Sequence, residues 1–95
     1  MSGFAQFSFT ISDLSRFLGK SAVTLRGWER AGHISFPRNG RGDRRFTLDD
    51  LRTVAASSVV RERVVQDRLR LFEATITILE IIEDENRRAR SPRIG

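Results

Sequence analysis

The side chains best suited to chemistry in this chain are its arginines, which gather between residues 20 and 45. Of the 17 basic residues, Lys20 is the only lysine. An Arg guanidinium holds five N–H donors in a rigid fork that matches phosphate oxygens and the edge of guanine. These residues offer non-covalent recognition of a polyanion, and nucleic acid is the expected partner. A basic surface that only aids solubility is the alternative that composition leaves open.

The excess of positive charge lies in the first part of the chain. Residues 1–55 hold nine Lys or Arg against five Asp or Glu, whereas residues 56–95 hold eight against seven. A balanced, highly charged second part is typical of an exposed helix with ion pairs along it. We therefore expect the first part to meet the anionic partner.

Several classes of function need residues that the sequence lacks. It has no Cys, and His33 is its only His, so no disulfide, metal site or other cofactor is expected. A chain of 95 residues favours a binding module over an enzyme. No apolar run approaches the roughly 18 residues of a membrane span, and no secretory signal is visible at Met1–Gly3. A cytoplasmic protein that does not contact membranes is expected.

Two short helices joined by a glycine-containing turn must position the first arginines. Residues 7–10 alternate apolar and polar side chains, as an extended arm does. Ser12 is a candidate N-cap for a first helix that ends at Gly19, and Ser21 is a candidate N-cap for a second helix that ends near Gly32. Such a pair is typical of a helix-turn-helix.

A small β-hairpin, or wing, must position the next arginines. Two glycines in the stretch 39–43 suit a tight turn, and residues 34–36 and 44–46 are the predicted strands on either side of it. Thr47 then begins a third helix, which ends before a break at Ser57-Ser58.

A long helix is predicted over residues 57–86. Its apolar side chains form a heptad seam with spacings of four and three, made of Val65, Leu69, Phe72, Ile76 and Leu79. A second apolar line runs beside the seam at Leu71, Ile78 and Ile82. Since a domain of this size should not cover so wide a stripe, we expect two chains to pair through the seam, in either direction. Residues 75–82 are rich in β-branched side chains, but their context favours helix over strand. Residues 87–95 are predicted to form a flexible basic tail.

The stretch from Thr24 to Leu51 resembles the DNA-binding domain of the MerR family. The matching residues are the run Thr24-Leu-Arg-Gly-Trp-Glu29, Gly32, the pair Pro37-Arg38, the turn Gly42-Asp-Arg44 and Phe46. Related domains occur in phage excisionases and small terminase subunits. The resemblance covers about residues 8–56. It implies a mainly α, winged helix-turn-helix fold over residues 1–56, followed by a long oligomerisation helix. Gly27 departs from the family pattern, which often has an aromatic residue there.

The resemblance also implies which residues meet DNA. A recognition helix shows polar and basic side chains to the major groove while its other side packs on the domain, so Leu25 and Trp28 are expected inside. The candidate DNA-binding residues lie on this helix and on the wing, and they are Lys20, Ser21, Thr24, Arg26, Arg30, Arg38, Arg41, Arg44 and Arg45. Arg26 is the best candidate for a base or phosphate contact. Gly27 either allows the backbone to approach DNA closely or is neutral at an exposed site.

The leading interpretation is a sequence-specific regulator that binds double-stranded DNA in a bacterial or phage-infected cell. It would act as a homodimer, without an effector domain and without a cofactor. The alternative is a phage protein that marks a DNA site, such as an excisionase or a small terminase subunit. That protein would form oligomers on DNA and recruit a recombinase or a packaging motor. The candidate protein partners of the chain are a recombinase, a polymerase and a packaging protein. A pure protein-interaction module is the third and least favoured reading.

Overall fold

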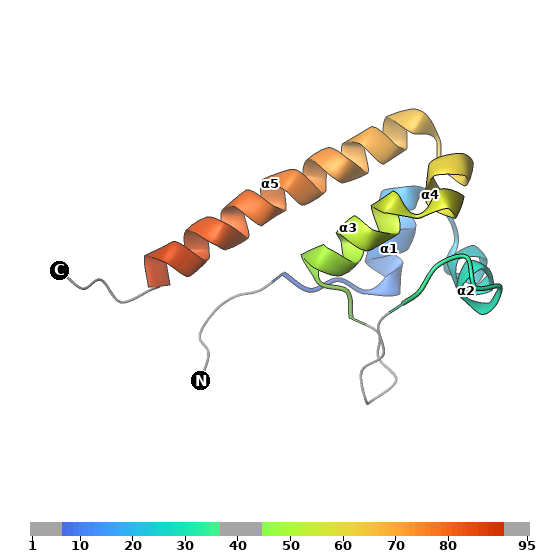
Figure 1. Cartoon of the computed structure of the whole chain (residues 1–95), viewed down its shortest axis with the longest axis horizontal. Helices are drawn as coiled ribbons and strands as arrows, with labels where there is room; N and C mark the ends of the chain where they lie inside the picture. Colours follow the sequence, from blue (N-terminus) through green and yellow to red (C-terminus); the bar gives the residue numbers. More distant parts are fainter. Residues whose placement is uncertain (1–6, 37–44, 91–95) are drawn as a thin grey trace.

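The computed structural model describes residues 7–36 and 45–90, and these parts of the chain are mainly helical. The helices follow one another as α1 (Ile11–Leu18), α2 (Ala22–Arg30), α3 (Leu48–Ala56), α4 (Ser58–Arg63) and α5 (Gln66–Arg90). Helix α5 lies along α3 and α1, and α2 lies at the other side of the domain (Figure 1). Among the described helices, none is long and apolar enough to cross a membrane.

The beginning of α1 is set by a reciprocal pair of hydrogen bonds. The backbone N–H of Asp13 donates to the Thr10 hydroxyl at 3.2 Å, and the Thr10 N–H donates to the Asp13 carboxylate at 2.9 Å. This capping box satisfies donors that the first helical turn leaves open. The prediction that Ser12 caps the helix is therefore wrong, since Ser12 lies inside the first turn. The predicted end at Gly19 is confirmed.

Gly19 is needed for its backbone conformation. Its φ of 68° lies in the left-handed region, where a side chain is strained. A Cβ there would also lie 2.7 Å from the Arg68 side chain, which would have to shift. The Arg68 guanidinium, at the beginning of α5, also donates to the Arg16 carbonyl oxygen at 3.1 Å. The end of α1 is thereby joined to the beginning of α5.

Helix α3 begins where the sequence predicts, at a second capping box between Thr47 and Asp50. Just before it, Phe46 forms an isolated antiparallel bridge with Phe9, with N–O distances of 2.8 and 2.9 Å. The predicted partner of this segment was the stretch 34–36. There the described contact is between rings, since Phe36 meets Phe46 edge to face at 5.1 Å. The turn of the predicted wing lies outside the described residues, so the wing stays a prediction.

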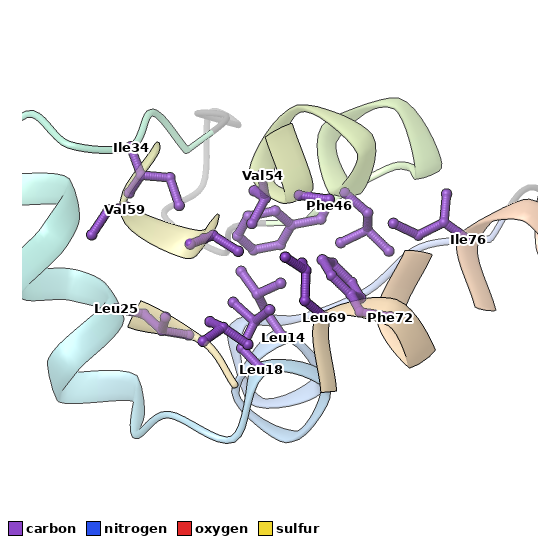
Figure 2. Close-up of a cluster of buried hydrophobic side chains, with 14 of the residues drawn as sticks. Leu14, Leu18, Leu25, Ile34, Phe46, Val54, Val59, Leu69, Phe72 and Ile76 are labelled. Atoms are coloured by element: carbon purple, nitrogen blue, oxygen red, sulfur yellow. The ribbon is translucent and has the colours of Figure 1, made fainter. Parts of the chain in front are cut away.

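A single core joins the helices. Leu14 and Leu18 of α1, Leu25 of α2 and Phe46 are almost fully buried, and they converge with side chains of α3 and α5 (Figure 2). Trp28 is half-buried and packs against this core, as do Phe9 and Phe17. The prediction that Trp28 packs on the domain is confirmed.

The predicted long helix is broken in two. Val64 adopts extended backbone angles (φ −94°, ψ 135°) between α4 and α5. Val59, Val60 and Val64 are all buried, so this turn contributes to the core and directs α5 back over α1 and α3. Helix α5 also continues to Arg90, so the stretch 87–90 of the predicted flexible tail is helical instead. The β-branched stretch 75–82 is helical, as predicted.

The heptad seam has a different environment from the one predicted. Leu69, Phe72 and Ile76 are at most 4% exposed, because they pack inside their own chain. Leu79 packs against the same core, whereas Val65 is 69% exposed. The large apolar side chains that α5 leaves exposed are Leu71, Ile78, Ile81 and Ile82. We call these four residues the outward face of α5. It contains the second apolar line of the sequence.

Candidate nucleic-acid interface

Helix α2 is anchored in the core by its inner side, and local hydrogen bonds cap its two ends. Leu25 is fully buried in the core, and Trp28 packs one turn later on the same side. At the first turn, Ser21 accepts a hydrogen bond from the Thr24 N–H at 3.1 Å, as an N-cap does. At the last turn, the His33 N–H donates to the Trp28 carbonyl oxygen at 2.9 Å. This short helix therefore presents its outer side in a defined orientation.

The outer side of α2 is formed by residues at helical spacings of three and four. Val23, Arg26, Gly27 and Arg30 share this side. Val23, Arg26 and Arg30 are exposed, and the Gly27 backbone is half-exposed. We call these four residues the outward face of α2. Its two guanidinium groups can contact DNA, and the small side chain of Val23 and the absent one of Gly27 allow close approach. Both features suit the major groove, which admits an α-helix.

The other predicted residues of α2 have local roles. The Ser21 hydroxyl donates to the Thr24 hydroxyl at 3.0 Å, so both side chains belong to the N-cap. Thr24 is half-buried and lies to one side of the outward face. The Lys20 backbone oxygen accepts a hydrogen bond from the Ser15 hydroxyl, which ties the turn to α1. Ser21 and Lys20 lie at the N-terminal end of α2, where free N–H groups favour phosphate.

Of the four arginines predicted for the wing, the structure describes Arg45. Arg38, Arg41 and Arg44 lie outside the described residues. Arg45 is exposed and directly precedes the fully buried Phe46. Arg45 is thus available at the surface, next to a residue anchored in the core.

One arginine of the basic first part serves the fold instead. The Arg52 guanidinium on α3 contacts Glu80 on α5, with Nη2–Oε1 at 2.8 Å and Nε–Oε2 at 3.3 Å. The Arg52 Nη2 also donates to the Thr77 hydroxyl at 2.9 Å. The hydrogen bond from Arg52 lowers the pKa of Glu80, and the same bond raises the pKa of Arg52. Arg52 therefore joins α3 to α5 and does not add to the charge beside α2.

Sequence reasoning missed Val23. It is 72% exposed, more than any other large hydrophobic residue in the described parts of the chain. The sequence did contain a signal for its exposure. Val23 lies two residues before the inward-facing Leu25, and this spacing places it on the opposite side of the helix. Across residues 7–36 and 45–90, no group of His, Asp and Glu side chains is arranged to hold a metal ion.

Comparison with known proteins gives one match. Residues 9–63 match the family model of the MerR helix-turn-helix regulatory proteins. The matched part includes α1 to α4 and ends just before the turn at Val64. No curated protein and no solved structure showed a significant match to the chain.

Proposed function

Because the chain belongs to the MerR helix-turn-helix family of regulatory proteins, we propose that it binds a specific sequence of double-stranded DNA as a homodimer and regulates transcription. The observation that carries this proposal is the outward face of α2. Arg26 and Arg30 are exposed there, on a helix whose opposite side is anchored by Leu25. An anchored helix with guanidinium groups on its free side has the form of a recognition helix.

In this proposal, α2 enters the major groove and Arg26 contacts a base edge. A bidentate contact between Arg and the O6/N7 edge of guanine is the commonest specific contact in the major groove. Arg30 lies one turn further along and contacts a base or a flanking phosphate. Lys20, Ser21 and the free N–H groups of the first turn bind backbone phosphate, which sets the position of the helix.

The wing forms the second contact. Arg38, Arg41, Arg44 and Arg45 flank the predicted glycine turn. Basic side chains on a small hairpin reach backbone phosphates or the minor groove beside the recognition helix. The exposed Arg45, next to the anchored Phe46, supports this placement at the base of the wing.

The dimer forms through the outward face of α5, in place of the seam that the sequence suggested. The side chains of Leu71, Ile78 and Ile81 are 54–65% exposed, which leaves an apolar strip for a second chain to cover. Charged side chains of both signs border the strip at each end, with Asp67, Arg68 and Arg70 near its beginning and Glu85, Arg87 and Arg88 near its end. The proposal therefore holds for antiparallel and for parallel pairing.

Selection of bound fragments from random and genomic DNA pools, at a stated salt concentration, tests the proposal. We expect a two-fold symmetric site near promoters and a mass in solution of two chains. A packaging site together with an eight- to ten-membered ring would instead support a terminase subunit. An attachment site with growth along DNA would support an excisionase. Recovery of no preferred sequence would exclude specific DNA recognition.

A further inference from the structure

The outward face of α2 carries an apolar side chain among its basic ones. Val23 is 72% exposed, and the other large exposed hydrophobic residues in the described parts are Val65 and residues of α5. Val23 therefore stands apart from the apolar strip proposed for pairing. Covering an exposed apolar side chain with an apolar group lowers the free energy, because apolar surface is removed from water.

A gap in the helix surface lies directly beside Val23. Gly27 follows four residues later, so the two positions are neighbours on one side of α2. Within residues 7–36 and 45–90, a Cβ added at Gly27 would meet no atom within 4 Å, so none of these residues crowds the position. Glycine nevertheless weakens a helix interior. The Val23 side chain thus borders a stretch of bare helix backbone, which we call the Val23–Gly27 notch.

We propose that the Val23–Gly27 notch receives the 5-methyl group of a thymine, so that Val23 selects one base of the target. This inference rests on the proposed DNA binding. The thymine methyl group is the apolar group that base pairs present in the major groove. Arg26 lies between the two notch residues in sequence and shares their side of the helix, so it holds the helix against the same stretch of DNA. The missing side chain at Gly27 lets the base edge come close to the backbone.

Replacing the methyl group on the DNA tests the notch directly. In the selected site, each thymine is replaced in turn by uracil, which pairs alike but lacks the methyl group. Binding of the full chain is measured by fluorescence anisotropy at one salt concentration. At one thymine of a half-site, replacement by uracil should raise the dissociation constant of the unaltered chain about fourfold. This is the change expected from the loss of one buried methyl group. The Val23→Ala chain should show a clearly smaller loss of affinity on this substitution, because alanine keeps only the Cβ of the valine side chain.

Two further variants separate the notch from general effects. Val65→Ala removes the same side chain from a position that is 69% exposed and outside α2, so it should keep the full uracil penalty. Gly27→Ala should not lower the melting temperature, yet it should weaken binding to the thymine site several-fold because it fills the notch. A uracil penalty that is equal in the unaltered and Val23→Ala chains at every thymine, or absent from both, would overturn the inference while leaving specific DNA binding intact. Failure to select any preferred site would overturn both proposals.

Discussion

The outward faces of α2 and α5 are both left uncovered by the core, yet they differ in chemistry. The α2 face combines Arg26 and Arg30 with one valine and a bare glycine. The α5 face is a strip of leucine and isoleucine, with charged residues around it. Separate surfaces of this kind suit separate partners, since guanidinium groups bind a polyanion and an apolar strip binds another apolar strip. The proposed function uses this difference, since it assigns DNA to the outward face of α2 and a second copy of the chain to the outward face of α5.

The largest expected effect concerns Phe72, a buried side chain that holds α5 against α1. Phe72 is 1% exposed and its ring lies 5.4 Å from that of Phe17, so Phe72→Ala should lower the free energy of unfolding by about 3–5 kcal/mol. Denaturant unfolding followed by circular dichroism measures the loss. A change below about 1 kcal/mol would mean that Phe72 is not a core residue and that the inner and outer sides of α5 are wrongly assigned.

The next effect separates pairing from folding. Replacing both Leu71 and Ile78 by Glu should yield helical monomers, because these side chains are exposed in the single chain. Affinity for a site with two half-sites should fall roughly 100-fold, because a monomer binds one half-site and no longer binds both at once. Sedimentation and gel-shift titration measure the two outcomes. A variant that stays dimeric would place the pairing surface elsewhere.

On the other face, Arg26→Ala should weaken specific binding by about 1–3 kcal/mol without changing the mass or the melting curve. The loss should be confined to the selected sequence, because a base contact is removed. An equal loss on every DNA sequence would instead identify Arg26 as a phosphate contact. Competition titrations with selected and scrambled duplexes distinguish these results.

The smallest effect concerns the link between α3 and α5. The lowered pKa of Glu80 means that the ionised form is stabilised in the folded chain, so its contribution is present above its ordinary value of 4.5. It is lost as the pH falls through the lowered value. Glu80→Gln should cost less than about 1 kcal/mol near neutral pH, because both side chains are more than a third exposed.

Unfolding free energies of the unaltered and Glu80→Gln chains, measured from pH 7 downward, test this link. The difference between them should be constant at neutral pH and should shrink below pH 4.5. A difference that is independent of pH would show that the Arg52–Glu80 pair does not contribute through charge.

Local signals in the sequence predict the helix-turn-helix well. The Gly19 turn, the Ser21 cap and the Thr47 start depend on residues close together in the chain, and the structure has all three. The inner position of Leu25 follows from its phase in the helix. The family match agrees with this part of the fold.

The second part could not be predicted in the same way. Periodicity indicates that Leu69, Phe72 and Ile76 share a side of a helix, but it does not indicate what covers that side. The answer depends on the turn at Val64, which no Gly or Pro marks. That turn is stabilised by burial of three valines, a tertiary effect that short-range patterns do not contain.

Titration of the full chain against its selected site and against a scrambled duplex, with the mass of each complex recorded, tests the central claim most directly. We predict two chains on the selected duplex, bound at least about 1,000-fold more tightly than on the scrambled one at physiological salt. Equal affinity for the two duplexes would contradict the claim that the outward face of α2 reads a DNA sequence. A single chain on the selected duplex would contradict the claim that the outward face of α5 joins two copies.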